Sequence, residues 1–121
     1  MTRDNGRKSK KAKIADTPYS IPCRIEPGMF RQEYLVYLDA IDPDDPKKKV
    51  AAQLLVDERD VFDIHGTPRR NNPASAKLRV ALVASHGEVA NVILPQPSQP
   101  LGESILVAAE SVRKAPTYGS V

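Results

Sequence analysis

Short apolar runs separated by proline, glycine and aspartate set the pattern of this chain. Residues 33–41 concentrate β-branched and aromatic side chains, and residues 77–83 begin by alternating polar and apolar positions. Residues 20–26, 88–94 and 102–108 are similar runs, with turn residues at 27–28, 42–46 and 86–87. Such runs, bounded by such residues, are typical of strands. The pattern predicts an all-β fold, a small antiparallel barrel or sandwich of five or six strands with short helical turns.

Residues 47–64 fit two structures. As a strand, alternate positions from Val50 to Val56 share an apolar face, whereas helical spacing gives an apolar stripe that Glu58 interrupts. Alanine, glutamine and leucine favour the helix, but three lysines at its start would oppose the helix dipole. We expect a strand to about Val56 and a helical turn near residues 57–61. The alternative is an α+β fold with a helix at about 47–64.

A faint internal repeat supports the strand. Residues 54–61 (LLVDERDV) resemble residues 105–112 (ILVAAESV), because each has three aliphatic residues, four mostly polar or small ones and then valine. Each copy follows a hairpin-like unit, so the repeat predicts two similar halves that close one barrel. We expect Pro95, Pro97 and Pro100, which lie before the second copy, to forbid regular structure.

Positive charge is concentrated at the start of the chain. Residues 17–121 hold 12 basic and 13 acidic side chains. Residues 1–16 hold two aspartates and six cations, namely Arg3, Arg7, Lys8, Lys10, Lys11 and Lys13. This segment has too little apolar surface to offset the entropy of ordering its backbone. We therefore expect a disordered basic tail at 1–16, a single small β-rich domain at 17–114 and a flexible C-terminal tail at 115–121.

A flexible cationic segment gains free energy near a polyanion by releasing counterions, and nucleic acid is the usual polyanion. The six cations of the tail are therefore candidate nucleic-acid-binding residues. Arg69 and Arg70, in a proline-flanked loop, are further candidates, with an ordinary solvated loop as the alternative. The predicted function is a non-catalytic binding module for RNA, DNA or a ribonucleoprotein. The alternative is a structural or protein–protein interaction subunit of a larger assembly, which the near-neutral body favours.

Three rings lie on or beside one predicted strand. Phe30, Tyr34 and Tyr37 could stack on bases in a β-barrel. Tyr34 and Tyr37 are an odd number of residues apart, so they face opposite sides of a strand. We expect at least one of these rings to lie in the core.

Catalytic and metal-binding motifs are not evident. Cys23 is the one cysteine, which excludes an internal disulfide, and its apolar context predicts a plain buried thiol. His65 and His86 lack metal-ligand spacing, and there is no glycine-rich phosphate loop, GxSxG or HExxH. We expect no enzyme activity, no metal and no cofactor. Because no apolar run reaches the ~18 residues of a membrane span and no secretory signal is evident, we expect a cytoplasmic protein without a membrane partner.

Overall fold

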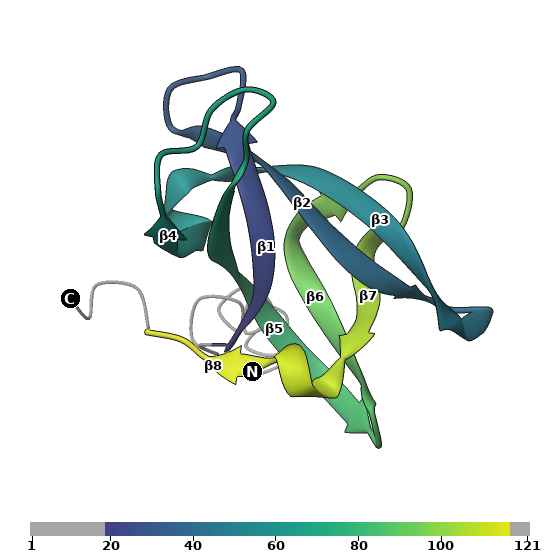
Figure 1. Ribbon diagram of the computed structural model, residues 1–121. Coiled ribbons are helices and arrows are strands. Elements are labelled where there is room, and N and C mark those ends of the chain that lie inside the picture. Colours follow the sequence, from purple (N-terminus) through teal and green to yellow (C-terminus); the bar gives the residue numbers. More distant parts are fainter. Residues whose placement is uncertain (1–18, 117–121) are drawn as a thin grey trace, which may run out of the picture.

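The computed structural model describes residues 19–116, and these residues form strands joined by short turns (Figure 1). Expectations for residues 1–16, and for all but the first two of residues 115–121, lie outside the described residues. The elements are β1 (Tyr19–Pro27), β2 (Glu33–Asp42), β3 (Asp45–Asp57), η1 (Glu58–Asp60), β4 (Val61–His65), β5 (Ala74–His86), β6 (Val89–Ser98), β7 (Gly102–Ala108), η2 (Ala109–Ser111) and β8 (Arg113–Lys114), where η1 and η2 are single 3-10 turns.

Five antiparallel strands close a barrel. β1 pairs with β2 and with β5, β6 pairs with β5 and β7, and the pairing of Ile41 with Leu106 joins β2 to β7. The remaining strands extend this barrel, with β3 on β2, β4 on β5 and β8 on β1. The predicted small all-β barrel is confirmed.

The helical alternative for residues 47–64 is wrong. Residues 45–57 form β3, paired with β2 along its length, and η1 supplies the expected helical turn. Ala52, Leu54 and Val56 are buried, whereas Gln53 and Leu55 between them are exposed. Period-two alternation against a partner strand therefore outweighs the helical propensity of alanine, glutamine and leucine.

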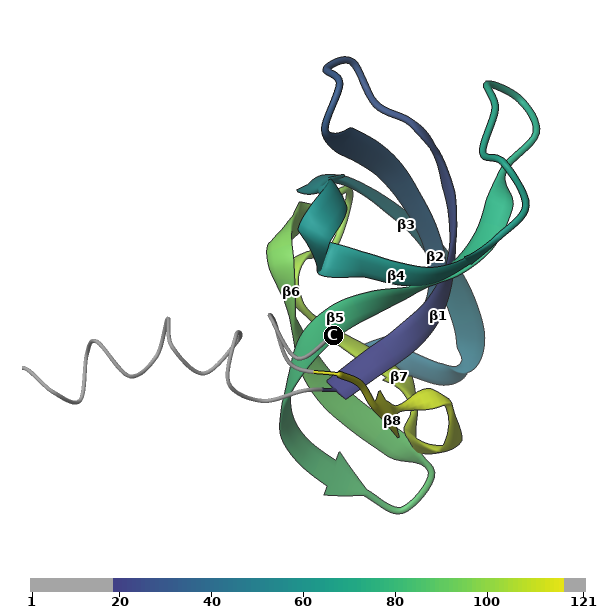
Figure 2. The ribbon, with the colours of Figure 1, turned by 90° about the vertical axis from the view of Figure 1, so that its left-hand side faces the viewer.

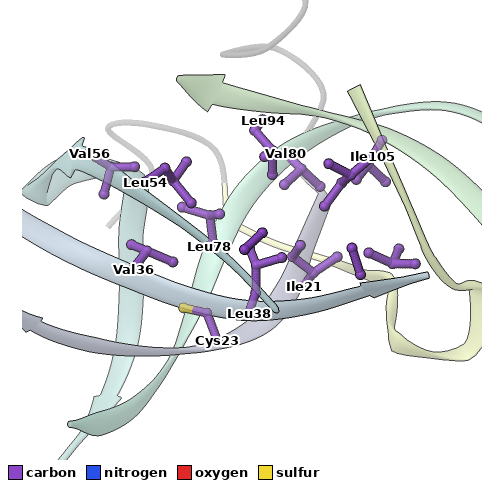
Figure 3. Close-up of a cluster of buried hydrophobic side chains, with 14 of the residues drawn as sticks. Ile21, Cys23, Val36, Leu38, Leu54, Val56, Leu78, Val80, Leu94 and Ile105 are labelled. Atoms are coloured by element: carbon purple, nitrogen blue, oxygen red, sulfur yellow. The ribbon is translucent and has the colours of Figure 1, made fainter. Parts of the chain in front are cut away.

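Apolar side chains on alternate positions of every long strand fill the barrel (Figure 3). Strands that close on themselves must turn one face inward, so the odd positions of β1 and the even positions of β2 and β5 converge. The largest fully buried side chains are Ile21, Ile25, Val36, Leu78, Val80, Val92 and Leu94.

The two halves of the chain repeat one succession of elements. Strand β3 leads through η1 into β4, and β7 leads through η2 into β8, which are the two segments that resemble each other in sequence. Each half begins with three antiparallel strands, and the first strands of the halves, β1 and β5, pair with each other. The repeat seen in sequence therefore corresponds to a repeated structure.

The expectation for the proline-rich segment is corrected. β6 continues through Pro95 and Pro97 to Ser98, and of the three prolines only Pro100 lies in a turn. The pairing of β6 with β7 is interrupted between Ile93 and Ser98. A proline is tolerated in a strand where no partner requires its missing N–H, which explains why the strand is not broken here.

Candidate nucleic-acid interface

Of the predicted binding residues, the structure describes two. Arg69 and Arg70 lie in the loop of residues 66–73 between β4 and β5, which projects from one end of the barrel (Figure 2). The backbones of Arg69 and Asn72 exchange two hydrogen bonds, of 3.2 and 2.9 Å, so Arg70 and Asn71 form a tight tip. Asn71 has φ 65°, a conformation that asparagine tolerates better than most residues. Both arginines are exposed. Arg3, Arg7, Lys8, Lys10, Lys11 and Lys13 lie outside the described residues.

Pairing of β1 with β5 places further cations on the outer surface. In this ladder Pro22 faces Lys77, Ser20 faces Arg79, and Arg24 faces Ser75. The residues that alternate with them, such as Cys23 and Leu78, belong to the core, so Arg24, Lys77 and Arg79 point away from it. β8 adds Arg113 and Lys114, which pair with Ser20 and Tyr19 at the start of β1.

The elements that carry these cations lie together, and β1, β4, β5 and β8 face the viewer in Figure 2. Together β1, β4, residues 66–73, β5 and β8 hold two carboxylates, Glu26 and Asp63, against seven cations. We call these seven cations the basic face; they are Arg24, Arg69, Arg70, Lys77, Arg79, Arg113 and Lys114. The rest of residues 19–116 holds five cations and eleven carboxylates. The near-neutral composition of the body therefore conceals an excess of cations on one set of strands and of carboxylates on the others.

The cations of this face differ in the interactions that their side chains make within the protein. The Arg79 guanidinium lies 4.9 Å from the centroid of the Phe62 ring, its Nε donates a 3.2 Å hydrogen bond to the Arg59 carbonyl, and another nitrogen donates to the Pro116 carbonyl. Arg24 and Lys77, by contrast, make no ion pair within residues 19–116. Their charges are available to an external anion.

The three candidate rings have different environments. Tyr34 packs against the core, as expected for at least one of them. Tyr37 is half-buried on the opposite, outer face of β2. Phe30 lies in the loop between β1 and β2, where it is 73% exposed.

Cys23 and His65, which could have formed a nucleophilic pair, both line a groove of about 530 Å³ but belong to opposite faces of the sheet. Cys23 lies on the inner side of β1 (Figure 3), opposite Ala76, and burial raises the pKa of its thiol to about 12, with a smaller opposing effect from Arg24. His65 is opposite Ser75, an outward position, with its Nε2 3.3 Å from a carboxylate oxygen of Asp63. His86 is exposed at the end of β5. The buried, protonated thiol cannot serve as a nucleophile at neutral pH.

Other classes of site are also absent from the described residues. No group of three or more histidine, cysteine, aspartate or glutamate side chains between residues 19 and 116 is placed to hold a metal ion. In the same range no helix is long and apolar enough to cross a membrane.

Comparison with known proteins gives no matching family model, curated protein or solved structure.

Proposed function

We propose that this protein is a non-catalytic nucleic-acid-binding module. The observation that carries the proposal is the basic face, which collects seven cations and two carboxylates on one side of a body with net charge near zero. Counterion release favours binding of such a surface to a polyanion without any fixed motif. The burial of the Cys23 thiol, on the opposite face of the sheet from His65, supports the non-catalytic part.

The cationic segment at the start of the chain is attached to the barrel next to the basic face. Residues 1–18 join the barrel at Tyr19, whose partner on β8 is Lys114. The six cations of the segment are thereby tethered beside those of the barrel. A tether raises the effective concentration of one binding element near the other. The segment and the basic face would then contact one continuous polyanion.

A salt series tests the proposal. We expect labelled RNA and DNA oligonucleotides to bind the full chain with a steep dependence on salt, measured by fluorescence anisotropy. Deletion of residues 1–16 should weaken binding but leave a part that depends on the basic face. The double substitution Arg24→Glu/Lys77→Glu should lower the slope of log K against log salt by about 1.4 if each cation contacts one phosphate of a single strand.

A charge-matched control makes this test specific. Lys47→Glu/Lys48→Glu changes the net charge by the same amount, but on exposed positions of β3, away from the basic face. Equal losses in the two double variants would mean that net charge alone governs binding and would reject the interface. Binding that does not respond to salt would reject the proposed function.

One feature favours a second candidate, a protein–protein contact. The loop of residues 28–32 exposes Met29 and Phe30, at 81% and 73%, although its backbone is held in place. A Glu33 carboxylate oxygen accepts hydrogen bonds from both of their amides, at 3.1 and 3.3 Å. Exposed apolar side chains on an ordered loop are typical of interaction sites. A stoichiometric protein partner that survives nuclease and moderate salt, and is lost in Phe30→Ser, would support this candidate.

A further inference from the structure

Tyr37 occupies the centre of a row of outward-facing side chains. The strand register places Arg24 of β1 on one side of Tyr37 and Gln53 of β3 on the other. Gln53 in turn exchanges backbone hydrogen bonds of 3.1 and 2.8 Å with Gln99. On the far side of Arg24 the row continues to Ser75. Tyr37 is thus an aromatic ring among hydrogen-bonding side chains, beside a cation of the basic face.

Hollows lie on both sides of this tyrosine. The groove of about 530 Å³ is lined by Tyr37 and Ser75, and the apolar residues Ile21 and Leu38 also reach it. Its lining includes three cations and three carboxylates, namely Arg24, Lys49, Lys77, Asp39, Asp63 and Glu110. A smaller hollow of about 240 Å³ is lined by Tyr37 together with Ala51, Gln53, Gln99 and Pro100. The tyrosine forms the ridge between the two, so flat groups have room beside it.

The groove follows from an incomplete seam in the barrel. β5 occupies one edge of β1 from Tyr19 to Ile25. On the other edge, β8 pairs with residues 19–20 and β2 with residues 24–27, so in the described chain residues 21–23 have no partner strand there. Pro22, which has no N–H to donate, lies at the centre of this gap. Arg24 and Tyr37 form the last pair of the β1–β2 ladder before this gap, so Tyr37 lies at the edge of the open space.

The surroundings of this ridge fit an unpaired nucleobase. A base is flat and apolar on its faces, with donors and acceptors at its edges, and it carries a phosphate on either side. Tyr37 offers a ring face, and Gln53, Gln99 and Ser75 offer hydrogen-bonding groups. Arg24 and Lys77, which line the groove, belong to the basic face and make no ion pair within residues 19–116.

We propose that Tyr37 is a stacking platform for an unpaired base, which makes single-stranded nucleic acid the ligand of this protein. This inference rests on the proposed function and adds the class of nucleic acid to it. A base in a duplex is already stacked and paired, so a duplex can use the basic face but not Tyr37. Phe30 is a poorer platform, because three carboxylates and a single cation, Arg31, line the hollow beside it, whereas three cations offset the three carboxylates of the groove beside Tyr37.

Binding of a single-stranded oligothymidine and of a duplex of equal total charge tests this assignment. With the full-length chain, we expect Tyr37→Ala to weaken single-strand binding about tenfold or more, and to leave duplex binding and the salt slope near wild type. Tyr37→Phe should bind nearly as wild type, because the ring remains. Phe30→Ala, which removes an exposed ring outside the basic face, should have no effect. Equal losses in Tyr37→Ala and Phe30→Ala, or equal losses for single strand and duplex, would overturn the assignment.

A direct optical measurement guards against an indirect effect of the alanine variant. The chain contains no tryptophan, so Tyr37→Trp and Phe30→Trp each introduce a single selectively excited reporter. Oligothymidine should quench the fluorescence of the Tyr37→Trp protein but not that of the Phe30→Trp protein. Salt-dependent binding without this quenching would refute the stacking site and leave the proposed function intact. Failure of the wild type to bind any nucleic acid at low salt would refute both.

Discussion

Truncation of Leu78 tests which side chains of the barrel strands point into the core. Leu78 lies in the middle of β5, is 0% exposed, and has Ile21 of β1 and Val61 of β4 as its neighbours across the sheet. Leu55 on β3 has the same chemistry but is 40% exposed on the outer face. If the strands close as described, Leu78→Ala opens a cavity among packed side chains, whereas Leu55→Ala removes atoms that water already contacts.

The expected magnitudes differ enough to be measured. A buried leucine truncated to alanine costs ~2–5 kcal/mol of unfolding free energy, and a substitution at an exposed site changes it by about 0.5 kcal/mol. A domain of this size is stable by roughly 5–15 kcal/mol, so Leu78→Ala removes a large part of the total. With a urea m-value of about 1–3 kcal/mol per molar, the unfolding midpoint should fall by roughly 1–3 M.

The assay is urea unfolding followed by circular dichroism, for the wild type and both variants. The wild-type and Leu55→Ala midpoints should lie close together, with Leu78→Ala well below them. Similar shifts in the two variants would refute the assignment of inner and outer faces, because the register of β5 with β1 and β4 would then be incorrect. Since a one-residue slip exchanges the faces of a strand, a larger shift in Leu55→Ala would have the same meaning.

Two further predictions concern single side chains. Because burial raises the pKa of the Cys23 thiol from 9.0 to about 12, the folded chain retains a proton that the unfolded chain loses in that range. The unfolding free energy of the wild type should therefore fall between about pH 9 and pH 12 by an amount that Cys23→Ala does not lose. Parallel profiles of unfolding free energy against pH for the two proteins would disprove this prediction. Glu33→Ala should increase amide hydrogen exchange at Met29 and Phe30 several-fold, because their acceptor is removed. Glu33→Gln keeps a side-chain oxygen and should exchange like the wild type; equal acceleration in both variants would contradict this account.

Local patterns in the sequence were sufficient to predict most strands. The runs at 33–41 and 102–108 correspond to β2 and β7, because β-branched residues and alternation report directly on a sheet with one buried face. The repeat favoured a strand to about Val56, which corresponds to β3, in a region where propensity alone favoured a helix. The odd spacing of Tyr34 and Tyr37 correctly required one of them to face the core.

Long-range pairing was not visible in the sequence. The prolines at 95 and 97 predicted a break, and only the local loss of pairing between β6 and β7 explains why the strand continues. The basic face was also missed, because Arg24 and Lys77 come together only when β1 pairs with β5. The alternation of Lys77 and Arg79 with apolar residues could have predicted a charged outer face on β5. No feature of the sequence indicated that β1 lies beside it.

Barrel closure and the candidate interface depend on the same pairing. β1 and β5 begin the two halves of the repeat, and their ladder completes the barrel and aligns Arg24 with the cations of β5. The start of β1 is also where the cationic segment joins, next to β8. An excess of charge distributed along the sequence would attract a polyanion without orienting it. The fold instead gathers cations on one set of strands, so that under the proposed function a polyanion drawn by the segment would meet the basic face. If the protein binds nucleic acid as proposed, the body would orient the polyanion, which a free cationic peptide could not do.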